Sequence, residues 1–477
     1  MRRAFFGAVA VDTENLTVPV DTPLRRFTHF LVYTRSLLVE QTTPMAHPIF
    51  DADATVSGID FVDQDLDVID MGGHLSWAPP DQLQRVEAYV LYLAHAADGE
   101  GRRPIHPRVA PGTTAVVLEE LPLRVDAAGA LSSHLAIYTR SRLAEQTTPA
   151  ARPVYDTVSQ AEELSFADQD LDAYEFGGAV EWREPADVSQ LTRYALYLAA
   201  DAVGANRSAY AAALPVGSAG GPARLDVPPG SRFDGYSHFL VFTASSFVEQ
   251  TTPTAHVKYD ADATVSAIFY DGKDLDADDL GGVLSWTLPA VLLRVEQYVM
   301  YLAMGADGRH RSQLGPPLAP SVSTYAVPPD TPREDYTHFV VYTKSALVEQ
   351  TTPASHCFFD EDALIENLTF VDYDLDEGEV GGLVTWSPAA VDDEVVEYLV
   401  YWATSAQGRH RALISSVSND THELRIPPDT GLAPYTHVLV YARSELAEQT
   451  TPSHHRIFDV FATASHILFT DLDLDPD

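Results

Sequence analysis

Hydrophobic and polar positions alternate in short blocks along the whole chain, and Pro, Gly and Asp separate the blocks. The clearest copy of the pattern reads LTFVDYDLD from Leu368, EVGGLVTWSP from Glu379, VVEYLVYWA from Val395, LRIPPDT from Leu424 and YTHVLVYARS from Tyr435. Short segments rich in Val, Tyr, Phe and Thr between turn residues are typical of β-strands. No long helical period competes with them, so the pattern predicts an all-β module.

The pattern repeats about every hundred residues. The string EQTTP recurs with steps of 105, 104, 100 and 99 residues, beginning at Glu40, Glu145, Glu249, Glu349 and Glu448. A tryptophan follows the same steps at Trp77, Trp182, Trp286 and Trp386. A fixed period of this kind is the signature of tandem modules.

These landmarks divide the chain into six segments. We assign the C-terminal half of a β-sandwich repeat to 1–54, four whole repeats to 55–160, 161–264, 265–364 and 365–464, and the first strand of a truncated repeat to 465–477. A half sandwich would leave an apolar sheet face exposed. We therefore expect either that the native protein is longer, which we prefer, or that the terminal fragments pair with another partner.

The order of landmarks resembles the fibronectin type III family of immunoglobulin-like sandwiches. A tryptophan precedes a proline turn in LSWAPP and VTWSP, and a Y-x-V-x-Y type strand follows at Tyr89, Tyr194, Tyr298 and Tyr398. Leu424, Pro427 and Tyr435 are similar to the family's corner before the sixth strand. The resemblance implies a tandem array of two-sheet sandwiches, and a role in adhesion, scaffolding or receptor-type recognition.

The charge and the cysteine content exclude several kinds of partner and covalent or metal cross-link. The chain has 69 Asp and Glu against 30 Lys and Arg, a formal net charge of −39, which repels nucleic acid and anionic lipid. Cys357 is the single cysteine, so neither an intrachain disulfide nor a cysteine-based zinc site can form. No apolar run is long enough to predict a membrane span.

An acidic tract near the start of each repeat is the main candidate site. The aspartates alternate in three of the whole repeats, and we treat them as possible Ca²⁺ ligands: Asp63, Asp65, Asp67, Asp168, Asp170, Asp172, Asp372, Asp374 and Asp376. The hydrophobic residues change from odd to even positions inside the tract, since Ile59 and Phe61 are odd-numbered and Leu66 is even-numbered. A regular strand would place them on opposite faces, so we expect a kink there, which would gather the carboxylates. The alternative is a solvated acidic edge that discourages edge pairing. In the third repeat Gly272 and Lys273 replace two positions, and we expect a weaker site there.

Two other recurring features offer no catalytic chemistry. A histidine recurs at His29, His134, His238, His338 and His437. We expect the preceding Ser or Thr to point to the opposite face of the strand, which leaves no nucleophile beside the ring. EQTTP suits a tight turn or edge, and its repetition fits either recent duplication or a repeated contact surface.

All four asparagines begin an N-x-S/T sequon, which predicts N-glycosylation at Asn15, Asn206, Asn367 and Asn419. Asn206 and Asn419 should lie in loops and Asn367 in a strand. We therefore expect a non-enzymatic extracellular or cell-surface protein, with unidentified protein partners and no certain cofactor except possible Ca²⁺. An acidic intracellular, cytoplasmic scaffold without metal is the alternative, and an enzyme is a remote one.

Overall fold

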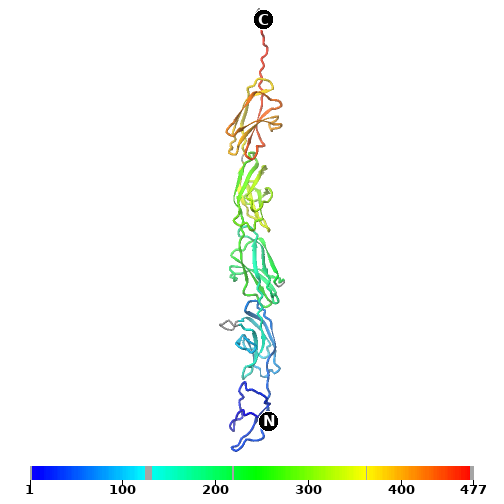
Figure 1. Cartoon of the computed structure of the whole chain (residues 1–477), viewed down its shortest axis with the longest axis vertical. Coiled ribbons are helices and arrows are strands. Elements are labelled where there is room, and N and C mark those ends of the chain that lie inside the picture. The colour runs from blue at the N-terminus through cyan, green and yellow to red at the C-terminus, as the bar shows by residue number, and fades with distance from the viewer. Residues whose placement is uncertain (1–2, 124–130, 218–219, 361, 473–477) are drawn as a thin grey trace. The chain divides into compact units, whose positions relative to one another are not determined.

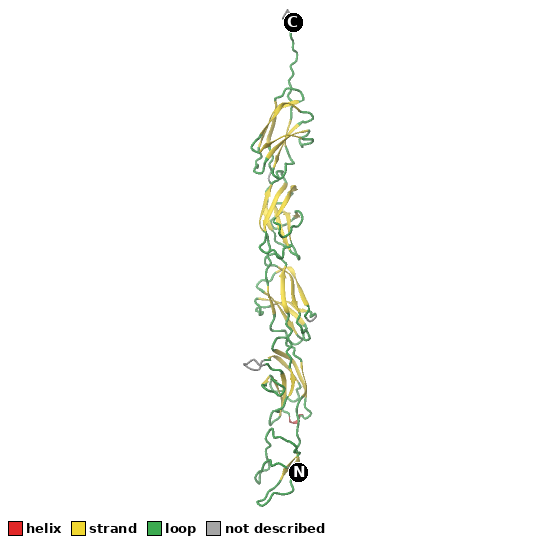
Figure 2. Ribbon diagram, viewed as in Figure 1, coloured by secondary structure: helices red, strands yellow, loops and turns green. Residues whose placement is uncertain are grey.

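The computed structural model describes residues 3–123, 131–217, 220–360 and 362–472. Strands and loops make up nearly all of this part, and its helical element is one short 3-10 turn, η1 (Leu83–Arg85) (Figure 2). Colour follows the chain through the successive sandwiches in Figure 1. The predicted fold class, an all-β tandem array of fibronectin type III-like sandwiches, is confirmed.

The described chain forms four sandwiches, which we call modules 1 to 4. Module 1 contains β3 (Ser57–Phe61), β4 (Asp70–Ala78), β5 (Ala88–Ala94), β6 (Arg103–Pro104), β7 (Ala115–Pro122), β8 (His134–Arg140) and β9 (Ala150–Pro153). Its two antiparallel sheets have the orders β3-β4-β7 and β6-β5-β8-β9.

Modules 2 to 4 repeat this topology. Module 2 contains β10 (Glu162–Asp168), β11 (Phe176–Arg183), β12 (Arg193–Ala199), β13 (Ser208–Leu214), β14 (Pro222–Ser231), β15 (His238–Ala244) and β16 (Thr254–Val257). Module 3 contains β17 (Ser266–Gly272), β18 (Asp279–Thr287), β19 (Gln297–Ala303), β20 (Ser312–Gln313), β21 (Thr324–Pro332), β22 (His338–Lys344) and β23 (Ala354–Cys357). Module 4 contains β24 (Glu366–Asp372), β25 (Glu379–Ser387), β26 (Glu397–Ala403), β27 (Ala412–Ser418), β28 (Glu423–Gly431), β29 (His437–Arg443) and β30 (Ser453–Arg456). In each, a three-stranded and a four-stranded sheet recur in the same order.

The terminal segments are not complete sandwiches. The leading segment holds one two-stranded sheet, β1 (His29–Val32) with β2 (Met45–Pro48). No strand forms in residues 465–472 of the trailing segment, where we expected one, because a strand needs a paired neighbour for its backbone groups. Residues 473–477 of that predicted strand lie outside the described residues.

By internal contacts the chain falls into two units. The first comprises Met1–Phe166, Val180–Leu225 and Asp234–Lys258, and the second comprises Ala167–Ala179, Asp226–Phe233 and Tyr259–Asp477. Every contact described below lies within one of them. No helix in the described chain is long and apolar enough to cross a membrane.

The recurring aromatic residues form the cores. Trp286 of β18 and Tyr298 of β19 are buried, and their rings meet edge to face with centroids 5.7 Å apart. The same pairing joins Trp77 to Tyr89, Trp182 to Tyr194, and Trp386 to Tyr398. Such pairs contribute about 0.5–1.5 kcal/mol beyond the burial of their area. The repeated tryptophan and tyrosine therefore define the centre of each sandwich.

Candidate functional site

The acidic tract comprises Asp63–Asp67 and its equivalents Asp168–Asp172, Gly272–Asp276 and Asp372–Asp376. It leaves the first strand of its module and enters the loop before the second strand. The predicted kink does not fall inside the tract: β3 ends at Phe61, and its register shift lies before the tract, between Ser57 and Asp60. The predicted solvated edge is wrong for modules 1 and 2, because Asp63, Asp65 and Asp67 are at most 3% exposed and their module 2 counterparts at most 5%. The tract is buried because backbone N–H groups surround its carboxylates.

The first aspartate closes the loop of its own module. Oδ1 of Asp63 accepts the N–H groups of Asp65 at 3.1 Å and Gly72 at 3.0 Å, and Oδ2 accepts the N–H of Thr157 at 2.9 Å. Asp168 and Asp372 make the same three contacts in modules 2 and 4. Each of these residues binds the start of the second strand and the linker after the last strand.

In modules 2 to 4 the second aspartate binds the three-stranded sheet. Oδ1 of Asp170 accepts the N–H of Asp172 at 3.1 Å, and Oδ2 accepts the N–H of Gly230 in β14 at 2.6 Å. Asp274 and Asp374 make the equivalent bonds to Asp330 and Asp429. Two of the three tract positions thus stabilise the fold of the module that contains them.

The third aspartate reaches the next module. Asp67 of module 1 accepts the N–H of Thr251 at 2.7 Å and the N–H of Thr252 at 3.0 Å, and it also accepts both threonine hydroxyls. Asp172 accepts the N–H groups of Thr351 and Thr352 and the Thr352 hydroxyl, and Asp276 accepts the N–H groups of Thr450 and Thr451. These threonines are the TT of EQTTP, in the loop before the last strand. The loop forms the predicted turn, and of the two explanations for its repetition the structure supports a repeated contact surface.

The leucine between the second and third acids adds an apolar contact. Leu171 is 1% exposed and belongs to the core of module 3, and Leu275 belongs in the same way to the core of module 4. Gln350 and Gln449 of EQTTP donate to the carbonyls of these leucines at 2.6 and 2.8 Å. Full burial of a leucine side chain contributes about 1.5–3 kcal/mol. We call the place where the acidic tract of one module meets the EQTTP loop of the next a junction.

The GG pair after the tract fits the junction sterically. A Cβ atom on Gly281 would lie 2.8 Å from Leu446 of the next module and 2.9 Å from the Cα of Pro329. A Cβ on Gly72 would lie 3.1 Å from Phe247, and one on Gly177 would lie 3.1 Å from Leu347. Only glycine, which has no Cβ atom, allows these side chains of the next module to approach the backbone so closely.

The glutamate of EQTTP acts within its own module. Glu145 pairs with Arg102 at 3.1 Å, and the Arg102 guanidinium lies over the rings of Tyr92 and Tyr138, 4.9 and 4.2 Å from their centroids. Arg207, Arg311 and Arg411 make the same arrangement with Glu249, Glu349 and Glu448. Sequence reasoning missed these arginines, although each follows a glycine turn at the same place in its repeat.

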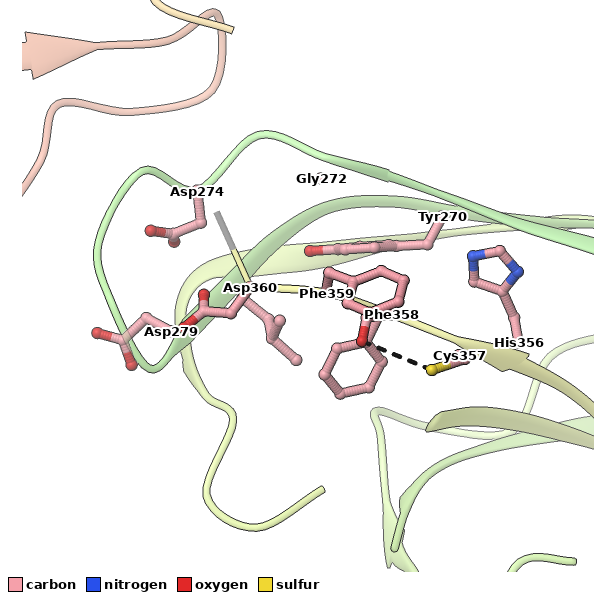
Figure 3. Close-up of a pocket in the computed structure, with 10 residues that line it drawn as sticks. Tyr270, Gly272, Asp274, Asp279, His356, Cys357, Phe358, Phe359 and Asp360 are labelled. Carbon is pink, nitrogen blue, oxygen red and sulfur yellow. Dashed lines mark hydrogen bonds between the residues drawn. The ribbon is translucent and has the colours of Figure 1, made fainter. Parts of the chain in front are cut away.

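Module 3 compensates for its missing first aspartate. The Tyr270 hydroxyl accepts the N–H of Gly281 at 3.0 Å, a bond that the carboxylate makes elsewhere. A Cβ on residue 272 would lie 3.1 Å from the Tyr270 ring, so tyrosine at 270 and glycine at 272 belong together. Figure 3 shows Tyr270 beside Phe358, with Asp274, Asp279 and Asp360 at one end of the group of residues that line a pocket. The volume of this pocket is about 160 Å³.

Burial changes the acidity of the tract. Burial raises the pKa of Asp63, Asp65 and Asp168 to about 6. The backbone N–H groups that bond these carboxylates favour the ionised forms and lower the pKa, but their effect is smaller than that of burial. In module 4 the N–H of Asp429 lowers the pKa of Asp374 instead. The tract therefore keeps charged groups in a partly desolvated loop.

Among the residues that the structure describes, carboxylates that could share a cation come together in three places. They are Asp170 with Asp172 and Glu175, Asp274 with Asp276 and Asp330, and Asp374 with Asp376, Glu379 and Asp429. In each group one oxygen per residue lies within 4.8 Å of the others. Asp172 and Asp276 already accept the threonine N–H groups of a junction, whereas Asp376 is exposed. The module 4 group therefore has the most free oxygen ligands.

The histidines differ from the expectation in one respect. The hydroxyl of the preceding Ser or Thr meets the ring, as with Ser133 Oγ and His134 Nδ1 at 2.7 Å, because it lies just outside the strand. All five histidines have this contact. Ser133 Oγ also donates to the His95 carbonyl, so it is a structural hydroxyl.

All four sequon asparagines are exposed. Asn206 and Asn419 lie in turns, as predicted, and Asn15 lies outside any strand. Asn367 lies in β24 at a register shift, with φ of 53°, and its amide donates to Ser387 at 3.2 Å. This bond holds the amide nitrogen to which a glycan would attach.

No family model matches the chain, and no curated protein matches it. Among solved structures, the crystal structure of chicken CNTN1 FN1-FN3 domains is similar to 63% of this chain and 98% of its own, with 13% identity and a TM-score of 0.22. The strand order and sheet pairing of the modules carry the fold assignment.

Proposed function

We propose that this chain is a non-enzymatic repeat protein, a spacer and scaffold whose modules present surfaces to protein partners. The observation that carries the proposal is the bond from the Thr pair of one module to the third aspartate of the module before it. It occurs with Asp67, Asp172 and Asp276, so the same contact recurs at each junction between whole modules. A contact that fixes each module on the next suits a protein that holds its binding surfaces apart.

The chemistry supports a specific junction. Charge-assisted hydrogen bonds are about twice as strong as neutral ones, and they are directional. Leu171 and Leu275, beside the third aspartates Asp172 and Asp276, are buried in the core of the next module, so water is kept from these carboxylates. Flexible linkers need neither feature.

The test compares the full chain with the triple variant Asp67→Asn, Asp172→Asn and Asp276→Asn. Each carboxylate accepts one threonine N–H on each of its two oxygens, and the amide nitrogen of asparagine cannot accept the second of these bonds. The junctions of the variant should therefore loosen, and small-angle X-ray scattering should show a broader range of maximum dimensions for the variant. The matched control replaces the exposed Asp81, Asp335 and Asp420 by Asn and changes the charge equally. Identical scattering from the variant and the wild type would refute the proposal.

We place the protein outside the cell or on its surface, and the exposed sequons support this compartment. An intracellular scaffold would have no use for them. A second candidate function is Ca²⁺ binding, which the four carboxylates around Asp374 favour over the other tracts. Oxygen-only ligands with flexible geometry suit Ca²⁺ better than transition metals.

A further inference from the structure

Two positions that differ in charge between modules lie beside the shared Asp, Leu and Thr contacts of the junctions. The first follows the first residue of the acidic tract and is occupied by Gln64, Gln169, Lys273 and Tyr373. A second variable position lies four residues before the buried tyrosine of each module and is occupied by Arg85, Gln190, Arg294 and Glu394. Module 3 alone has a base at the first position, and module 4 alone has an acid at the second.

These two exceptional residues meet. Lys273 of module 3 forms an ion pair and a hydrogen bond with Glu394 of module 4, and their side chains are 20% and 28% exposed. Asp271 lies 3.7 Å from the same ammonium group. The Glu394 contact raises the pKa of Lys273. The lysine carbonyl also accepts the Ser444 hydroxyl at 2.6 Å, so backbone and side chain of Lys273 both contact module 4.

We infer that Lys273 and Glu394 make the end of module 3 specific for module 4. The inference rests on the proposed junction function. The constant contacts cannot distinguish one module from another, because the Asp, Leu and Thr residues are shared. Successive similar modules are prone to misassembly, and specificity requires a contact that is unfavourable with the wrong partner. Arg294 of module 3 occupies the position of Glu394, so a second module 3 would place a cation against Lys273.

The experiment follows hydrogen exchange in the full chain. The Thr450 and Thr451 amides, which bond Asp276, report on the junction between modules 3 and 4. The Thr351 and Thr352 amides report on the junction before it. Lys273→Glu should speed exchange of the first pair about fivefold, because a partly buried ion pair becomes a like-charge pair. The second pair should be unchanged.

The double variant Lys273→Glu with Glu394→Lys restores opposite charges and should return the exchange rate to within about twofold of the wild type. Glu394→Arg, which installs the residue of module 3, should loosen the junction as Lys273→Glu does. Lys344→Glu makes the same charge change at an exposed lysine outside this junction and should leave Thr450 and Thr451 unaffected.

Asp276→Ala separates the two proposals. If it speeds exchange while Lys273→Glu and Glu394→Arg do not, the junction exists and the specificity inference is wrong. If Asp276→Ala has no effect, the proposed junction function fails as well. Loss of protection in both threonine pairs after Lys273→Glu would indicate general unfolding and would also overturn the inference.

Discussion

The Asp172 carboxylate accepts the N–H of Thr352 at 2.9 Å, although the two residues belong to successive modules. A tract aspartate and a loop threonine therefore depend on each other across about 180 residues of sequence. This dependence explains why the acidic tract and EQTTP recur together. Neither motif has a complete set of partners inside its own module.

Glycine at position 281 should be essential for the junction after module 3. Gly281→Ala places a methyl group against Leu446 and the Pro329 backbone, and overpacking of this kind costs about 1–3 kcal/mol. Hydrogen exchange of the EQTTP loop of module 4 should speed up accordingly. Gly112→Ala is the control, because a Cβ there meets nothing within 4 Å. Equal behaviour of the two variants would show that Leu446 does not pack on Gly281.

The fold was predictable from sequence because strand alternation and the Trp and Tyr landmarks depend on local spacing. Trp286 and Tyr298 lie in neighbouring segments, and their burial follows from the pattern. The junction was not predictable. The repeat fixes the order of the motifs within a module, but it does not show that Asp172 binds the EQTTP loop of the next module and not that of its own module. The buried state of the tract was missed for the same reason, since its N–H donors come from distant loops and linkers.

Acidification should first stabilise the tracts of modules 1 and 2. Burial raises the pKa of Asp63, Asp65 and Asp168 to about 6, above the value of about 3.9 in an unfolded chain. Between the unfolded and the folded pKa, these carboxyl groups bind more protons in the folded state than in the unfolded state. The free energy of unfolding therefore increases as pH falls from 7 towards 4. Hydrogen exchange of the core peptide around Tyr89, corrected for intrinsic rates, measures the change.

The control for pH is Asp63→Asn, which removes one titrating group and should flatten the dependence in module 1. General relief of repulsion in a chain of charge −39 acts on both proteins, so their difference isolates Asp63. An unchanged slope in the variant would contradict the raised pKa. Carboxyl NMR titration of Asp63 gives the same answer directly.

Glycan should attach most readily where the sequon lies in an exposed turn. Expressed behind a signal peptide in a glycosylating eukaryotic host, the chain should gain glycosidase-sensitive mass at Asn206 and Asn419. Asn367 should be modified less, because its amide bonds Ser387 within β24. Ser387→Ala frees that amide and should raise occupancy at Asn367. A chain without glycan at any site would remove the main support for an extracellular location.

Calcium should act on module 4 before the other modules. At a dissociation constant of about 10⁻⁴ M, 1 mM Ca²⁺ would stabilise the module by about 1.4 kcal/mol, and each kcal/mol shifts the melting temperature by about 4–8 °C. The melting of module 4 in the full chain can be followed by exchange of the peptide around Tyr398, in CaCl₂ or in MgCl₂ of equal ionic strength. Calcium should raise the transition more than magnesium does.

The decisive variant for calcium is Asp429→Asn, which removes one carboxylate of the four and keeps the N–H that Asp374 accepts. Asp429 has φ of 59°, a conformation that asparagine tolerates well, so the turn should persist. The difference between calcium and magnesium should disappear in this variant and persist in Asp420→Asn, which removes an exposed charge from the same module. Equal shifts with both ions in the wild type would mean that the ions only screen like-charge repulsion, and the acidic tract would then serve the junctions alone.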